Sequence, residues 1–149
     1  MEYSDFPKDF IMRTQKNLKK YRGKFEVTNL INSCLGLIII PKEQLKNNLP
    51  IYIFNDQDKK TYGISKINIK YEVNGDFSLT KTVDHIRNGI AHGRIQQRSS
   101  FDKRIIGLRI HDSYSTKEPE NFSIELSVYE LYRFALKISN EFLKGIIID

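Results

Sequence analysis

Residues 86–94 read IRNGIAHGR, and the rest of the sequence has to decide what this stretch means. An Arg-Asn pair, Arg87 and Asn88, is followed by His92, which stands just before Gly93 at the end of a helical pattern. The chain has only three histidines, so the position of this one is informative. One interpretation is a helix that stops at a glycine. The other is a functional motif at the end of that helix.

The helix that carries this stretch is predicted over residues 78–92. Its apolar residues recur at helical spacing and form one stripe. These are Leu79, Val83, Ile86 and Ile90. At about 100° per residue, His85, Asn88 and His92 fall roughly opposite the stripe and Arg87 falls at its border. Gly93 is expected to end the helix in the left-handed conformation.

The flanking sequence predicts a mostly α-helical protein. One helix is expected over 4–22 and a second, strongly apolar one over 26–40. A β-hairpin is expected from RIIGLRIHD through a polar turn to FSIEL. Ser127 and Glu130 form a capping box that opens a last long helix. Residues 42–77 are expected to be an irregular insertion with an extended piece near INIKYEV.

The expected architecture is therefore one domain, residues 1–149. It is a bundle of about four helices with a small β-hairpin between the third and fourth helices.

Composition places the chain in the ordinary globular class, with 40% hydrophobic and 28% charged residues. No apolar run is long enough for a membrane span. The single Cys34 cannot form an internal disulfide and lies on a predicted core stripe. These features predict a cytoplasmic protein with no membrane partner. The formal net charge of +6 permits a polyanionic partner, although a basic cluster can also be a solvated face.

Arginine and histidine at this spacing suit RNA cleavage. RNA carries its own nucleophile, the 2′-hydroxyl, so the protein has to move a proton near neutral pH, which histidine does. Arginine can stabilise charge on the phosphoryl oxygens, and asparagine can orient either group. No carboxylate cluster or Cys/His ligand set argues for a metal, and no cofactor is expected. The expected product is a 2′,3′-cyclic phosphate.

IRNGIAHG resembles the R-x4-H motif of the HEPN superfamily, whose members are helical bundles and often metal-independent ribonucleases. The opening DFPKDFIMRTQKNL, the helix EVTNLINSCLGLIIIPKE and the hairpin-then-helix ending resemble single-domain bacterial HEPN nucleases. The resemblance implies that Arg87 and His92 are the catalytic pair and that Asn88 is the polar residue following the arginine. It also implies a homodimer in which two motifs build a composite site.

The resemblance further implies a toxin or a phage-defence effector, with RNA as substrate. An antitoxin or another neighbouring-gene protein is the expected partner. Some HEPN toxins carry a tyrosine two residues after the histidine; Arg94 occupies that position here, which puts control through that tyrosine in doubt. A basic cluster around the motif is predicted to bind the RNA backbone. It comprises Arg94, Arg98, Lys103 and Arg104.

Each residue also has a structural interpretation. Arg87 could pair with Asp84 one turn back, His92 could cap the helix, and Asn88 could be an exposed polar residue. Asp84 and His85 are supporting candidates, with His85 favoured as a solvated or interface histidine. The alternative function is a non-catalytic HEPN dimer that binds RNA or protein. DNA binding is disfavoured because no helix-turn-helix pattern offers a recognition helix.

Overall fold

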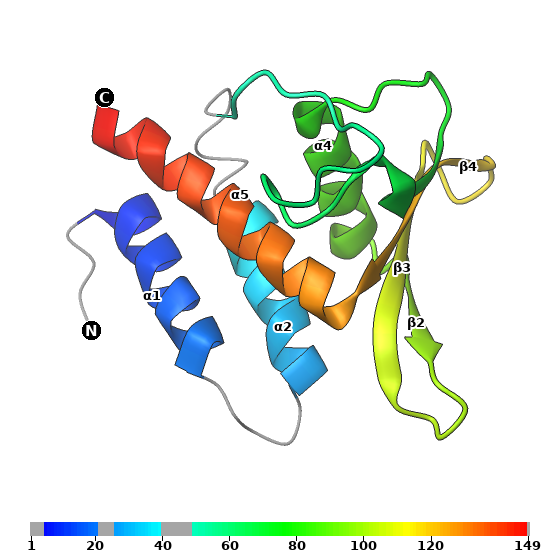
Figure 1. Ribbon diagram of the computed structural model, residues 1–149, viewed down its shortest axis with the longest axis horizontal. Coiled ribbons are helices and arrows are strands. Elements are labelled where there is room, and N and C mark those ends of the chain that lie inside the picture. Colours follow the sequence, from blue (N-terminus) through cyan, green and yellow to red (C-terminus); the bar gives the residue numbers. More distant parts are fainter. Residues whose placement is uncertain (1–4, 21–25, 40–48, 149) are drawn as a thin grey trace.

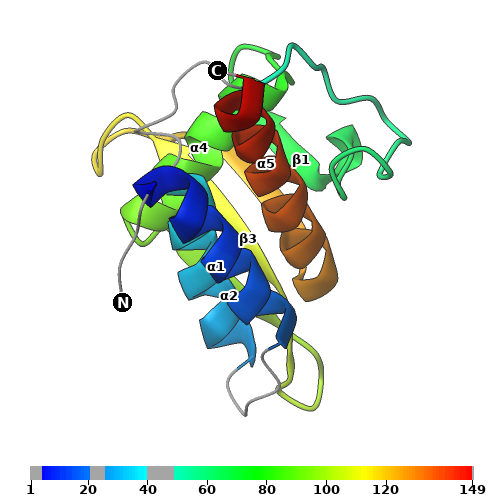
Figure 2. The same ribbon diagram turned by 90° about the vertical axis from the view of Figure 1, so that its left-hand side faces the viewer.

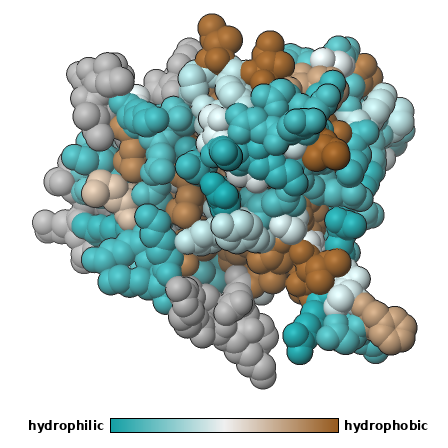
Figure 3. Space-filling model, in the orientation of Figure 1, coloured by the Kyte–Doolittle hydropathy of each residue, from teal (hydrophilic) through white to brown (hydrophobic). Residues whose placement is uncertain are grey.

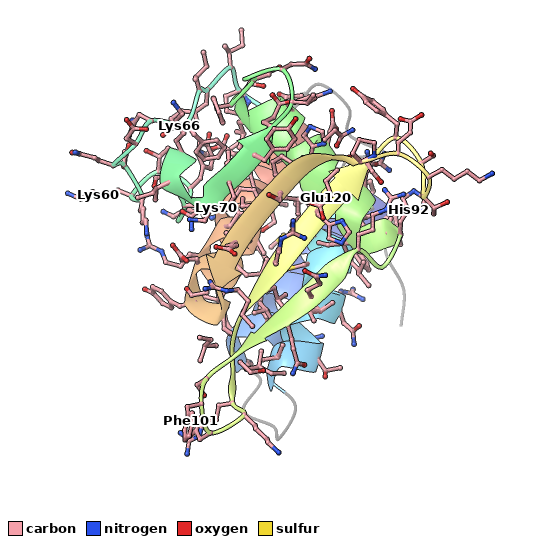
Figure 4. The ribbon with its side chains drawn as sticks, turned by 90° about the vertical axis from the view of Figure 1, so that its right-hand side faces the viewer. Lys60, Lys66, Lys70, His92, Phe101 and Glu120 are labelled. Carbon is pink, nitrogen blue, oxygen red and sulfur yellow. The ribbon has the colours of Figure 1, made fainter. Side chains whose placement is uncertain are left out.

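The computed structural model describes residues 5–20, 26–39 and 49–148, and it shows two layers. Helices pack over one face of an antiparallel β-sheet (Figure 1). Figure 2 looks onto the helical layer, with strand β3 behind the helices. Figure 4 looks from the opposite side, where the sheet faces the viewer. Within the described ranges, no helix has the length and apolarity needed to cross a bilayer.

The predicted helices are present. Helix α1 spans Phe6–Lys20, α4 spans Leu79–Ala91 and α5 spans Val128–Ile148. Helix α2 spans Glu26–Cys34 and continues as a π-helix, η1, over Leu35–Ile39. The first helix was expected to extend to residue 22 and the second to residue 40, and both of these ends lie outside the described residues.

Two local predictions about these helices are confirmed. The apolar stripe of α4 is buried along its whole length, with Leu79, Val83 and Ile86 fully buried. The capping box at the start of α5 is formed in both directions, because Ser127 N–H donates to Glu130 Oε1 and Glu130 N–H donates to Ser127 Oγ. Both features depend on residues close together in the sequence, which is why periodicity and spacing sufficed to predict them.

The predicted fold class, a helical bundle with a small hairpin, is wrong. The strands are β1 (Ile69–Glu72), β2 (Ile95–Ser99), β3 (Ile105–Ser113) and β4 (Glu120–Ser127). They form a four-stranded antiparallel sheet in the order β1-β4-β3-β2. The protein is therefore a mixed α/β fold. The predicted hairpin corresponds to β3 and β4, which are the two central strands of this sheet.

The two edge strands explain the error. Strand β2 has one apolar residue, Ile95, and its other four side chains are polar and exposed. The sequence of this strand therefore shows no alternation of apolar and polar residues. Strand β1 pairs with β4 across a long stretch of chain, with Tyr71 opposite Ser123 and Glu72 opposite Phe122. A local pattern cannot show such a pairing.

Residues 49–68 form loops and a short 3₁₀ helix, η2 (Lys66–Asn68), before β1. Tyr52, Phe54 and Tyr62 make edge-on ring contacts in this segment. Asn68 Nδ2 donates to Glu130 Oε2 and ties η2 to the start of α5. The assignment of residues 1–149 to one domain stays a prediction.

Candidate functional site

The motif helix comes very close to the sheet at Gly89. A Cβ atom at this position would lie 2.5 Å from Ile110 Cγ2 and 2.6 Å from the carbonyl oxygen of His111, both on β3. Only a residue without a side chain fits such a contact. The glycine inside IRNGIAH therefore sets the distance between α4 and β3, and it brings polar residues of the helix to the end of that strand.

His85 lies in this contact, buried between two acidic strand residues. Glu72 on β1 and Asp112 on β3 are both register partners of Phe122 on β4. The His85 ring stacks on Phe122 at 4.4 Å between centroids. Its Nδ1 is 2.9 Å from Asp112 Oδ2 and its Nε2 is 3.6 Å from Glu72 Oε1. The favoured interpretation of His85 as a solvated or interface histidine is wrong for this chain.

Asp112 is the centre of the polar network. Besides His85, it accepts from Arg94 Nη1 at 2.9 Å and from Asn88 Nδ2 at 3.3 Å. Asn88 Oδ1 in turn accepts from Arg87 Nη2 at 2.9 Å. The asparagine of the motif is therefore held on both sides, and it orients the arginine. Sequence reasoning missed Asp112 because its partners are 18–27 residues away in the chain, on α4 and at Arg94 in the α4–β2 connection.

Helix α4 ends as predicted. Gly93 has φ of 68°, in the left-handed region, and His92 is the C-cap residue, whose N–H donates to Asn88 O at 3.0 Å. The His92 side chain is exposed. Its position at the cap leaves the imidazole free of core packing while the backbone beneath it is fixed.

An open pocket lies beside this helix end, with a volume of about 500 Å³. Helix α4 forms one wall, and the end of β3 with the β3–β4 connection forms the other. His92, Asn88, Arg94 and Asp84 line it, together with buried His85 and Asp112. Arg87 is not among the lining residues, but its Nη2 donates to Asn88, which is one of them. Figure 4 shows His92 beside the β3–β4 connection, at the end of the molecule opposite Phe101.

A family model described as HEPN pEK499 p136 matches residues 1–147. The chain belongs to this HEPN family. The resemblance inferred from the motif is thereby confirmed, and it extends over nearly the whole chain. HEPN membership indicates a nuclease or RNA-related function, since HEPN domains are commonly ribonucleases and often dimeric. Comparison with characterised proteins and with experimentally solved structures gave no match.

The structure separates the basic residues predicted to bind RNA. In this HEPN protein Arg94 is part of the pocket, where its Nη1 also donates to Ser113 O at 3.1 Å. Arg98 is exposed on edge strand β2. Lys103 and Arg104 lie in the β2–β3 turn, and Arg104 Nε is 3.2 Å from Asp102 Oδ2.

That turn is the far end of the hairpin from the pocket. Figure 4 shows Phe101 at the tip of the projecting β2–β3 hairpin. In Figure 3 hydrophilic side chains cover most of the visible face, and apolar ones form separate patches, one of them on this projecting end. Phe101, Ile105 and Ile106 are the exposed apolar residues there. RNA that reached both His92 and Lys103 would have to run along the hairpin.

Charge on the outer face of the sheet is partly neutralised. Arg109 pairs with Glu120, and this hydrogen bond lowers the pKa of the Glu120 carboxyl. His111 Nδ1 is 3.5 Å from Glu120 Oε1. Among residues 5–20, 26–39 and 49–148, no three His, Cys, Asp or Glu side chains are grouped to hold a metal ion.

Proposed function

We propose that this HEPN protein is a metal-independent endoribonuclease whose reacting groups are His92 and Arg87. The observation that carries the proposal is the arrangement at the end of α4. His92 is exposed at a polar pocket, and Arg87 is oriented by Asn88, which is itself anchored to Asp112. A pre-oriented arginine and an accessible histidine are the groups that phosphoryl-transfer chemistry on RNA uses.

In the proposed reaction His92 removes the proton of the ribose 2′-hydroxyl. The 2′-oxygen attacks phosphorus, the bond from phosphorus to the 5′-oxygen breaks, and the leaving 5′-oxygen takes up a proton. The products are a 2′,3′-cyclic phosphate and a 5′-hydroxyl. Arg87 stabilises the negative charge that accumulates on the phosphoryl oxygens. Asn88 is a positioning residue in this scheme.

We further propose a homodimer, in which the motif ends of two α4 helices meet. Arg87 is not among the lining residues of the pocket, so in this proposal the second copy completes the site around the phosphate. A toxin or phage-defence role, with an antitoxin or neighbouring-gene partner, fits such an enzyme. A cytoplasmic location follows from the same role.

The test is cleavage of total RNA by the purified protein in the presence of EDTA. His92→Ala and Arg87→Ala should each lower the rate by roughly 10²–10⁴-fold. Asn88→Ala should be milder. Both catalytic positions lie off the buried stripe of α4, so the variants should keep the parental melting temperature and oligomeric state.

A folded His92→Ala variant that cuts RNA at the parental rate would falsify the catalytic proposal. A parent that cuts nothing, but whose RNA or protein binding is lost on Arg87→Ala, would instead support the alternative, a non-catalytic HEPN binding module.

A further inference from the structure

The pocket beside His92 is lined by more aromatic and hydrogen-bonding side chains than RNA cleavage alone requires. Its volume of about 500 Å³ is in the usual range for sites that bind small molecules or parts of larger ones. The wall opposite α4 consists of the β3–β4 connection and the first residues of β4, and it carries a tyrosine, several hydroxyls and an asparagine amide. None of these groups takes part in the network around Asp112 except through Ser113.

Asn121 is the most informative residue of this wall. It is 4% exposed, and its Oδ1 has no hydrogen-bond partner within the described part of the chain. Its backbone is fixed, because its carbonyl oxygen accepts from Val73 N–H at 2.9 Å. A buried polar atom without a partner is unfavourable, and native proteins usually satisfy such atoms. Since Asn121 lines the pocket, a ligand in the pocket can supply the missing hydrogen bond.

Tyr114 supplies an aromatic surface at the same pocket. It is 72% exposed, so its ring is accessible to a bound molecule. Lys81 and Arg94 also line the pocket and offer positive charge. The carboxylate of Asp112 in the pocket floor already contacts Arg94 Nη1 and His85 Nδ1, each at 2.9 Å, so it does not present an unpaired negative charge to a ligand. An aromatic ring, an amide that can both donate and accept, and cations nearby together suit a nucleotide.

We propose that this pocket binds one nucleobase of the RNA, next to the phosphate that is cut, and makes the HEPN protein selective for base identity. Tyr114 stacks on the base and Asn121 hydrogen-bonds to its edge. The proposal rests on the proposed ribonuclease function for its position relative to the cut. Because the amide presents one donor and one acceptor, it distinguishes bases by the order of these groups along their edges.

The first experiment maps the cut sites of the full-length protein on a pool of RNAs with randomised bases. The parent should prefer one base at a fixed position from the cut by about ten-fold or more, as a specific hydrogen-bonded contact gives. Asn121→Ala should abolish most of this preference, and Asn121→Asp, which keeps the size but only accepts, should change which base is preferred. Tyr114→Ala should raise KM for all sequences by roughly 5–150-fold, with kcat changed little.

Tyr129→Ala is the matched control. Tyr129 is a 65% exposed tyrosine on α5, outside the pocket, so its loss should leave both KM and base preference unchanged. Should Asn121→Ala fail to fold, Tyr114→Ala and Asn121→Asp still decide the matter, because Tyr114 is on the surface. A parent with no base preference, or a preference that survives Asn121→Ala and Asn121→Asp, overturns the proposal and leaves the ribonuclease proposal intact.

If the parent cuts no RNA, the ribonuclease proposal fails and a second experiment decides the base site separately. The four nucleoside 3′-monophosphates are titrated against the protein, and amide shifts of residues 112–121 are followed by NMR. Binding of one base over the others that is lost in both Asn121→Ala and Tyr114→Ala supports the base site. Equal or absent binding of all four overturns it.

Discussion

Replacing Gly89 by alanine tests whether the approach of α4 to β3 builds the site. In an ordinary helix interior, glycine to alanine stabilises by about 1 kcal/mol because alanine has the higher helix propensity. Here the new Cβ would lie 2.5 Å from Ile110 Cγ2 and 2.6 Å from His111 O. The optimal separation of nonbonded carbon atoms is about 3.5–4.0 Å. The helix and the strand would therefore have to separate by about 1 Å.

The strand cannot move freely to relieve this contact. His111 N–H donates to Arg94 O at 3.1 Å, and His111 is the register partner of Ser123 in the central pair of strands. Overpacking of this kind costs about 1–3 kcal/mol, which at least cancels the helix-propensity gain. We expect a net loss of up to about 2 kcal/mol, or a melting temperature lower by up to roughly 8 °C for a chain of this length.

Thermal unfolding followed by circular dichroism measures the change. Thr80→Ala on the exposed side of the same helix is the control, and it should stay within about 0.5 kcal/mol of the parent. If Gly89→Ala melts above the parent, as an unconstrained helical glycine would, the close approach is refuted. Cleavage of RNA should slow in the same variant, since Asn88 would move away from Asp112.

Four further outcomes follow from the contacts described above. Asp112→Asn should lower RNA cleavage at least ten-fold and make it insensitive to Asn88→Ala, because both changes act on the same positioning network; additive losses in the double variant would contradict this. Burial raises the pKa of Glu130, but hydrogen bonds from Ser127, Asn68 and Lys59 outweigh it and lower that pKa below its ordinary 4.5, so Glu130 stabilises the fold above about pH 4.5 and this contribution disappears as the pH falls through the lowered value. Glu130→Gln should accordingly be less stable than the parent in urea at pH 7, and the difference should shrink as the pH falls below 4.5. Burial raises the pKa of the Cys34 thiol to about 12, so a thiol reagent should label it only in denaturant; rapid labelling of the native protein would show that the α2 face opens. Lys103→Ala should reduce the salt dependence of RNA affinity by about one counterion, and an unchanged slope would remove the hairpin tip from the RNA path.

The helices and the motif were predictable because their information is local. The stripe Leu79, Val83, Ile86 and Ile90 repeats within one helix, and the capping box of α5 spans only four residues. The left-handed glycine after His92 follows from the chemistry of a helix end. None of these features depends on what the rest of the chain does, so the structure reproduces them.

The sheet was predictable only in part: the extended piece expected near INIKYEV contains β1, but the pairing of β1 with β4 and the presence of β2 were not predicted. The segment IQQRS of β2 is largely solvent-exposed, and its arginine was interpreted as part of a basic cluster. Strand β1 joins the sheet only by pairing with β4, and the motif helix lies between these two strands in the sequence. A helical-wheel argument then assumed one buried side on α4, whereas this helix packs against both the helical core and the sheet.

That second buried side explains the pattern of polar residues in the motif helix. A helix covered on two sides must bury some of its polar positions, and a buried polar group is tolerated when it has a hydrogen-bond partner. Glu72 and Asp112 lie on β1 and β3, on either side of Phe122; Asp112 Oδ2 is hydrogen-bonded to His85 Nδ1 at 2.9 Å, and Glu72 Oε1 lies 3.6 Å from His85 Nε2, a charge contact beyond hydrogen-bond distance. Asp112 Oδ2 also accepts from Asn88 Nδ2, and Asp112 Oδ1 accepts from Arg94 Nη1. The polar side of α4 is thus divided between a buried half, which fixes the helix to the sheet, and an exposed half ending at His92. Because Asn88 bonds both Asp112 in the buried half and Arg87, any change that loosens the buried half also moves Arg87. The position of the motif is therefore set by its contact with the β-sheet, most of which was not predicted from the sequence.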